Sequence, residues 1–187
     1  MAIWLDWLRD LFSSLLTALG LVNKNATIIL VGLDNAGKTT LLNRLASGTF
    51  GAFAPTVKPT HNEFKAGSVT FRAWDLGGHE AVRQLWEDFL PTTDGVVFLV
   101  DSADPDRIAE CEEELSALAA DDALFDVPIA VLYNKTDLAF ALGDEELRTG
   151  LDWEVLERRE GPIQGFRCSV LQGTGYTEAF QWLSNFC

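Results

Sequence analysis

The chain has 187 residues, of which 48% are hydrophobic and 22% are charged, a composition typical of one folded globular domain and not of a disordered protein. Its formal net charge of −14 disfavours nucleic acid and anionic lipid as electrostatic partners, because both are bound through lysines and arginines. The three cysteines show no metal-binding spacing, which favours free thiols in a reducing compartment.

Residues 3–19 are predicted to form an amphipathic helix, because their apolar side chains recur every three or four positions. Charges in the first half argue against a transmembrane span, and the basic start and cleavage pattern of a signal peptide are missing. Two interpretations stay open: the helix packs on the domain's own core, or its apolar face inserts into a bilayer interface. Ala2 excludes N-myristoylation, and Cys187 stands too late for a C-a-a-X prenylation box.

Gly32–Thr39 matches the phosphate-loop pattern G-x-x-x-x-G-K-[ST]. The loop follows the apolar run Ile28–Val31 and precedes a helical pattern, and this strand–loop–helix context supports the match. Backbone N–H groups and the helix N-terminus are expected to bind phosphate, with Lys38 reaching the terminal phosphates and Thr39 holding Mg²⁺. An ordinary glycine-containing turn is the alternative. The expected nucleotide-binding residues of this loop are Asp34, Asn35, Ala36, Gly37, Lys38, Thr39 and Thr40.

The segment Phe71–His79 is predicted to be a strand that ends in an acid and two glycines. Asp75, at the carboxyl end of this strand, is well placed to bind Mg²⁺ and is expected to do so through water, opposite Thr39. Gly78 is expected to bring its backbone N–H to the γ-phosphate. His79 is expected to orient the attacking water as a mostly neutral imidazole, although a solvated loop histidine is the alternative.

Two further apolar runs, Gly95–Asp101 and Ile129–Tyr133, are predicted to be strands buried on both faces. The second run leads into the motif N-K-x-D, formed by Asn134, Lys135 and Asp137. The Asp137 carboxylate can accept from two N–H donors of guanine, whereas adenine offers a mismatched edge, so the motif predicts guanine specificity. Asn134 is expected to tie this loop to the phosphate loop, and the stem of Lys135 to cover the base.

The carboxyl-terminal part is expected to complete the base site and the core. A strand over Ile163–Arg167 leads into a loop whose Ser169, Val170 and Leu171 offer backbone groups to the base. The last helix, within Gly175–Phe186, presents a core-facing stripe. The stripe consists of Tyr176, Ala179, Phe180, Trp182, Leu183 and Phe186.

The acidic stretch between Asp104 and Asp126 is interpreted as a solvated helix face, with a partner surface as the lesser alternative.

With these motifs assigned, the chain resembles the Ras-superfamily small GTPases, and within them the secretion-associated Ras-related (SAR) GTPases of the COPII coat, relatives of the ADP-ribosylation factors. ADP-ribosylation factors usually carry glutamine in place of His79 and a myristoylated glycine at position 2, so His79 and Ala2 favour the SAR branch. The segment between Asp137 and Cys168 is shorter than is usual for that family, and the chain is more acidic. The resemblance rests on Gly32–Thr40, Pro55–Thr60, Trp74–His79, Leu90-Pro91, Asn134–Asp137 and Cys168–Leu171.

The resemblance implies an α/β P-loop NTPase fold, a mostly parallel six-stranded sheet flanked by helices, with residues 1–22 as a membrane-binding helix and 23–187 as the GTPase domain. It implies GTP or GDP and Mg²⁺ as ligands, with Thr56 as the switch threonine that joins the metal when GTP is bound. The hairpin around Gly67-Ser68 is implied to slide between nucleotide states and to expel the N-terminal helix.

The implied partners are the endoplasmic reticulum membrane, bound through residues 3–19, and the inner coat subunits of COPII, which include a GTPase-activating protein. A membrane-anchored exchange factor is also implied. The implied location is the cytosolic face of that membrane, in exchange with the cytosol, with the Golgi as a further possibility.

His79, Lys38 and Gly78 are the expected catalytic residues. Residues 50–60 contain no arginine, and Asp34 places a carboxylate close to the phosphates, so we expect slow hydrolysis unless a partner supplies an arginine. Two alternatives remain: a metabolic kinase or ATPase, and an Arf-like GTP-binding switch or scaffold at another membrane with little useful hydrolysis. A kinase or ATPase leaves the Asn134–Asp137 motif without a purpose.

Overall fold

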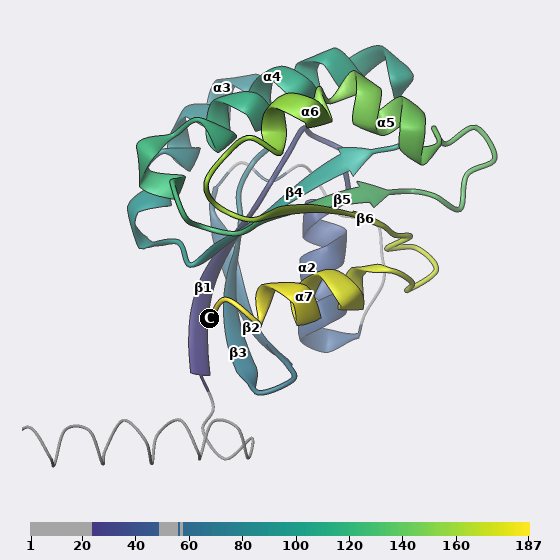
Figure 1. Cartoon of the computed structure of the whole chain (residues 1–187). Helices are drawn as coiled ribbons and strands as arrows, with labels where there is room; N and C mark the ends of the chain where they lie inside the picture. Colours follow the sequence, from purple (N-terminus) through teal and green to yellow (C-terminus); the bar gives the residue numbers. More distant parts are fainter. Residues whose placement is uncertain (1–23, 49–55, 57) are drawn as a thin grey trace, which may run out of the picture.

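The computed structural model describes residues 24–48, 56 and 58–187, and the expected helix over residues 3–19 lies outside them. The described residues form a six-stranded sheet in the order β2-β3-β1-β4-β5-β6, flanked by helices (Figure 1). All neighbouring strands are parallel except β2 and β3, which form an antiparallel hairpin. The strands are β1 Lys24–Val31, β2 Thr60–Ala66, β3 Val69–Asp75, β4 Gly95–Asp101, β5 Ile129–Asn134 and β6 Ile163–Arg167.

Helices cover both faces of the sheet, as the fold-class prediction required (Figure 1). The helices α2 and α7 lie on one face, and α3, α4, α5 and α6 lie on the other. The helices are α2 Lys38–Ser47, α3 Glu80–Arg83, α4 Ile108–Ala119, α5 Asp144–Gly150, α6 Trp153–Leu156 and α7 Tyr176–Leu183. Short 3-10 helices lie between these elements, at Gln84–Trp86, Leu90–Thr92, Pro105–Arg107 and Asp122–Leu124.

The central strands read as uninterrupted apolar runs because their side chains are buried alternately in two cores. In β4, Val96, Phe98 and Val100 pack toward α4, whereas Val97 and Leu99 pack toward α2 and α7. All seven residues of β4 and all six of β5 are buried, which confirms the prediction of strands covered on both faces.

The carboxyl ends of the parallel strands place the sequence motifs at one edge of the sheet. Leu30 of β1 pairs with Asp75 at the end of β3, and Asp101 at the end of β4 pairs with Asn134 at the end of β5. The loops that follow these four strands therefore meet at the same edge, which is where doubly wound α/β proteins bind their ligands.

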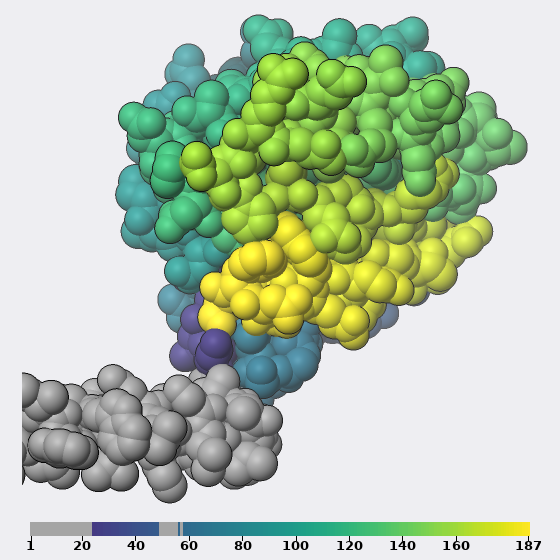
Figure 2. All heavy atoms as spheres, in the orientation of Figure 1, coloured from purple at the N-terminus to yellow at the C-terminus, as the bar shows by residue number. Residues whose placement is uncertain are grey.

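The last helix is shorter than predicted. It ends at Leu183, and Phe186 beyond it is 48% exposed, so the expected stripe of six core residues is wrong at its last member. Ala179, Phe180 and Leu183 are buried as expected. The ring centroids of Phe180 and Phe64 are 5.0 Å apart, and this contact packs α7 against the β2–β3 hairpin. In Figure 2 the yellow carboxyl-terminal segment lies beside the blue atoms of the hairpin.

The acidic stretch is only partly a solvated helix face. Glu113 is exposed on α4, but Glu110 and Glu114 pair with Arg83, at 2.6 and 2.7 Å between nitrogen and oxygen. Two of the acids therefore hold the loop after β3 against α4. The three cysteines are free, as predicted. In the part of the chain that the structure describes, every helix is too short or too polar to cross a bilayer.

Candidate nucleotide-binding site

A cavity of about 420 Å³ opens at the carboxyl edge of the sheet, between the loops that follow β1, β3, β5 and β6. Most of the predicted nucleotide residues line it. Ala36, Asp75 and Ser169 are buried directly behind this lining. The lining residues are Asp34, Asn35, Gly37, Lys38, Thr39, Thr40, Thr56, Gly78, His79, Asn134, Lys135, Asp137, Leu138, Val170 and Leu171.

The phosphate loop has the geometry of an anion site. Gly37 precedes α2 with φ +104°, and a Cβ atom there would stand 2.5 Å from the amide nitrogen of Asn134. This position therefore needs glycine both for its backbone conformation and for the close approach of the base loop. Gly37 has no side chain to cap α2, and the first residues of the helix, Lys38–Thr40, line the cavity. An anion there can accept from the backbone N–H groups that a helix N-terminus leaves unpaired.

Lys38 is the buried cation of the site. Its ammonium group donates to the carbonyl oxygens of Gly32 and Leu33, each at 2.8 Å, and the residue is 6% exposed. Burial lowers the pKa of Lys38 to about 8, although the nearby carboxylates of Asp75 and Asp34 oppose this shift. A phosphate group in the cavity favours the charged amine and raises its pKa again.

We expect nucleotide affinity to fall as the pH rises through the pKa of Lys38 in the free protein. The pKa of about 8 is the lower one and the phosphate-bound pKa is the higher one, so binding takes up a proton between them. Affinity for GDP should therefore be nearly full at pH 7, about half as high at pH 8 and about tenfold lower at pH 9 than at pH 7. Equilibrium titration of a fluorescent GDP across this range measures the effect.

The matched control for this titration is Lys38→Met, which keeps a long side chain but cannot titrate. Its weaker affinity should show no fall over the same pH range. A flat wild-type curve, or a variant curve as steep as that of the wild type, contradicts the assignment of this proton to Lys38.

Three side chains form an oxygen cluster beside Lys38 that fits a magnesium ion. The hydroxyls of Thr39 and Thr56 donate to the same oxygen of Asp75, at 2.7 and 2.9 Å. The other carboxylate oxygen, Oδ1, is buried without a hydrogen-bond partner among the described residues. Burial raises the pKa of Asp75, which marks the cost of a charge held there. Hard oxygen donors around an uncompensated carboxylate suit Mg²⁺, so the three residues fit the metal expected from the sequence.

The loop after β3 lies directly on the phosphate loop. A Cβ atom on Gly78 would stand 2.4 Å from the Gly32 carbonyl oxygen and from the Lys38 amine nitrogen, so only glycine fits. Arg83 donates to the Gly78 carbonyl at 2.8 Å, and Trp86 donates to that of Gly77 at 2.9 Å. These two bonds position the loop from the side away from the cavity.

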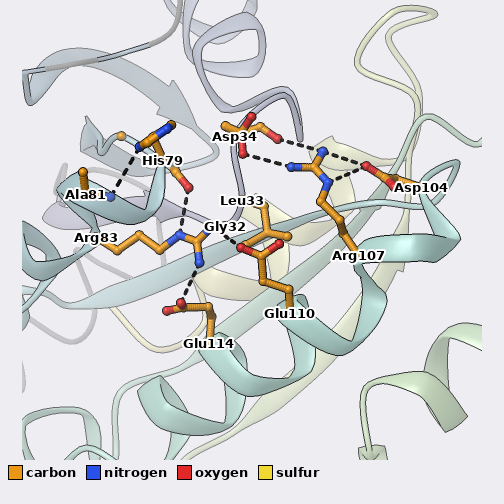
Figure 3. Close-up of polar contacts among 12 residues, drawn as sticks. Gly32, Leu33, Asp34, His79, Ala81, Arg83, Asp104, Arg107, Glu110 and Glu114 are labelled. Carbon is orange, nitrogen blue, oxygen red and sulfur yellow. Dashed lines mark hydrogen bonds and ion pairs between the residues drawn. The ribbon is translucent and has the colours of Figure 1, made fainter.

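His79 lies at the rim of the cavity, and its ring has a second task. Its Nδ1 accepts a hydrogen bond from the backbone N–H of Ala81 at 3.3 Å and so caps α3 (Figure 3). The sequence prediction had assigned this residue a water-orienting role and had not foreseen the cap. Both tasks can coexist, because Nε2 is the nitrogen that the cap does not use.

The base loop is built around Asn134. Its amide nitrogen donates to the Ala36 carbonyl at 2.8 Å, which is the predicted tie between base loop and phosphate loop. Its amide oxygen accepts from the backbone N–H of Val170 at 3.0 Å and so also holds the third loop. Asp137 accepts from the Ser169 hydroxyl at 2.5 Å, and this bond orients the carboxylate that is expected to face the base.

Several residues of the site carried no sequence signal. Leu138 lines the cavity directly after the N-K-x-D motif. Arg44 of α2 donates to the carbonyls of Val170 and Leu171, at 2.9 and 3.0 Å, and thereby fixes the third loop. Arg107 pairs with Asp34 at 2.9 Å. These contacts join residues that are 73 or more positions apart, which no local pattern reveals.

The geometry agrees with the comparisons with known proteins. The model of the ADP-ribosylation factor family matches residues 12–187. The small COPII coat GTPase SAR1 of Giardia intestinalis is 45% identical, over 95% of this chain and 97% of the relative. The SAR1 protein of Nicotiana tabacum is 38% identical, over 96% and 98% of the two chains. ADP-ribosylation factor 3 of Arabidopsis thaliana is 37% identical, over 87% of this chain and 88% of the relative.

A solved structure shares the fold. The Arl6 BBS3 small GTPase of Trypanosoma brucei, with bound nucleotide analogue GppNp, superposes with a TM-score of 0.78 and 32% sequence identity, covering 87% of this chain and 96% of the other. These matches confirm the predicted fold class and the resemblance stated from the sequence. The chain therefore belongs to the ADP-ribosylation factor family of small GTPases, enzymes that hydrolyse GTP.

Proposed function

We propose that this protein is the small GTPase switch of a COPII coat, which binds the cytosolic face of the endoplasmic reticulum membrane in its GTP state and recruits the inner coat. The extent of the SAR1 matches is the observation that carries the proposal. They cover 95% and 96% of the chain, whereas a match without the first 22 residues would reach at most 88%. The likeness to the coat GTPases thus extends into the segment whose periodicity predicts an amphipathic helix.

The cavity supports this proposal, because its lining residues can be matched to each part of a guanine nucleotide. The phosphate loop with Lys38 and the N-terminus of α2 binds the phosphates. Asp137 accepts from the two N–H donors of guanine. Lys135, in the same loop, is held by its ion pair with Asp101, at 2.5 Å between nitrogen and oxygen. Backbone groups of Ser169, Val170 and Leu171 complete the base site. This division of roles explains why four loops, and not one, line a single cavity.

Mg²⁺ belongs to the proposed site, held by Thr39 and Thr56, with Asp75 acting through water. When bound, the ion screens the negative charge of the terminal phosphates. Asp75 Oδ1, which lacks a partner among the described residues, would then accept hydrogen bonds from the water shell of the metal. The two threonine hydroxyls, 2.8 Å apart, are close enough to face one ion together.

Hydrolysis by the protein alone is expected to be slow. His79 orients the attacking water, Gly78 offers its backbone N–H to the γ-phosphate, and Lys38 balances charge on the phosphates. Two arginines near the phosphate loop, Arg83 and Arg107, are both engaged in ion pairs with carboxylates (Figure 3), and Arg44 donates to carbonyls of the third loop. We therefore propose that an activating coat subunit supplies the missing arginine, which typically gives about 10³–10⁵ in rate. A membrane-anchored exchange factor would reload GTP.

Liposome flotation tests the proposed membrane switch. The full chain loaded with a non-hydrolysable GTP analogue should float with the vesicles, and the GDP form should stay in solution. A chain that lacks residues 1–22 should stay in solution with either nucleotide, because attachment rests on burial of apolar side chains.

Two outcomes of the flotation contradict the proposal. Equal binding in both nucleotide states means that the helix is not under nucleotide control. In the other outcome, the protein binds vesicles only with GTP and yet neither recruits coat subunits nor hydrolyses GTP faster in their presence. That result points instead to an Arf-like switch at another membrane.

A further inference from the structure

The phosphate loop contains a carboxylate that works against its ligand. Asp34 lines the cavity, and its side chain is 46% exposed. It lies close enough to the Lys38 amine to influence the pKa of that group. An unpaired negative charge at this place repels a nucleotide in proportion to the number of charges on its phosphates.

Arg107 compensates this charge from outside the nucleotide motifs. It directly precedes α4, and its guanidinium group lies 2.9 Å from a carboxylate oxygen of Asp34. The same group reaches the Asp34 carbonyl oxygen at 3.5 Å. Figure 3 shows the arginine extending from the start of α4 to the phosphate loop.

Asp104 holds the arginine in place. Its carboxylate pairs with the guanidinium group of Arg107 at 2.6 Å, with a second bond of 2.7 Å from Nε. The Arg107 and Asp104 side chains are 30% and 27% exposed, so water screens their charges only in part. The loop after β4 thus brings an arginine, itself paired with Asp104, to the one acidic side chain of the phosphate loop. The cluster of three side chains is one unit of charge less negative than it would be without Arg107.

We propose that Arg107 is an electrostatic determinant of nucleotide affinity, which neutralises Asp34 and so permits a highly charged polyphosphate to bind. The inference rests on the proposed guanine-nucleotide site and adds to it a residue beyond its sequence motifs. It explains how a loop with a built-in carboxylate accepts an anion. It also predicts that the effect of Arg107 depends on the ligand's charge, being largest for GTP and smallest for GMP.

The test compares Arg107→Ala with the wild type for a non-hydrolysable GTP analogue, GDP and GMP, by competition against a fluorescent GDP at fixed magnesium. Affinity should fall about tenfold for the GTP analogue, about threefold for GDP and least for GMP, as expected for partly exposed charges. These losses should shrink in 1 M salt, where the Debye length is about 3 Å against about 10 Å at 0.1 M.

A second variant separates charge compensation from mechanical support. Adding Asp34→Asn to Arg107→Ala should restore the affinity for the GTP analogue, because both charges are then absent. Asp34→Asn alone should raise the ratio of GTP-analogue to GDP affinity. Arg148→Ala is the matched control, since it removes an arginine from an exposed ion pair with Glu157, outside the nucleotide cavity, and should leave all three affinities unchanged.

Equal losses for the three nucleotides, or no recovery in the double variant, overturn the proposal and leave Arg107 as a mechanical support of the loop. Thermal unfolding of each variant identifies any that fail to fold, and the Asp34→Asn variant then carries the test alone. If the wild type binds no guanine nucleotide at all, the proposed function itself is wrong. The two failures are therefore distinguishable.

Discussion

Asp137→Asn is expected to convert the protein from a guanine-nucleotide binder into a xanthine-nucleotide binder. The carboxylate accepts from two N–H donors of guanine, and an amide at the same place turns one of its acceptors into a donor. With guanine bound, the amide N–H of the asparagine would face one of the two guanine N–H donors. Affinity for GDP should therefore fall by about 10²-fold or more. Xanthine carries a carbonyl oxygen where guanine has its amino group, and it therefore matches the amide.

Competition of GDP and xanthosine diphosphate against a fluorescent nucleotide measures this conversion. The Ser169 hydroxyl, which donates to Asp137 Oδ1 at 2.5 Å, can donate equally to the amide oxygen, so the loop should keep its geometry. Asp144→Asn is the control, because this exposed carboxylate pairs with Arg167 outside the cavity. A variant that loses both nucleotides equally would show that Asp137 supports the loop and does not read the base.

His79→Ala is expected to abolish most of the GTP hydrolysis that the proposed activating coat subunit would stimulate. Loss of a positioned group that orients or accepts a proton from water typically costs about 10²–10⁴ in rate. Affinity for GDP should stay within about twofold, because the histidine lies at the rim of the cavity and its expected task concerns the γ-phosphate. Single-turnover assays with and without the coat subunit separate the two quantities.

The capping bond of His79 requires a second variant. Asparagine is a good helix N-cap and can replace the acceptor that binds the Ala81 N–H at 3.3 Å, but its side chain is too short to orient the water. His79→Asn should therefore be as inactive as His79→Ala. If asparagine restores hydrolysis, the histidine acts only by capping α3.

The fold could be predicted to a large extent because burial leaves a clear mark on the sequence. Strands β4 and β5 lie under helices on both faces, so Gly95–Asp101 and Ile129–Tyr133 appear as apolar runs with well-defined ends. The sequence pattern does not reveal helices α5 and α6, because α5 is mostly polar with Leu147 as its buried residue and α6 has only four residues. Phe186 was placed in the core because the helical period continues past Leu183, where the helix itself ends.

The cavity lining was predictable for a different reason. Asn134 and Asp137 belong to motifs whose spacing is dictated by the shape of one ligand, so local sequence reports them. The supports of the site obey no such spacing. Arg107 contacts Asp34, which lies 73 positions away in the sequence. Arg83 contacts Glu110 and Glu114 of α4, which lie 27 and 31 positions away. Only folding brings the arginines and their acidic partners together. The local sequence of α4 shows acids without nearby cations, and it therefore predicts a solvated face.

The most direct test of the account is nucleotide competition on the wild-type protein. With fluorescent GDP bound in the presence of Mg²⁺, we predict that GDP and GTP displace it at near-stoichiometric concentrations, and that ATP fails to do so even at about 10³-fold higher concentration. Displacement by ATP and GTP with similar affinity would contradict the central claim that the loops after β5 and β6 select guanine.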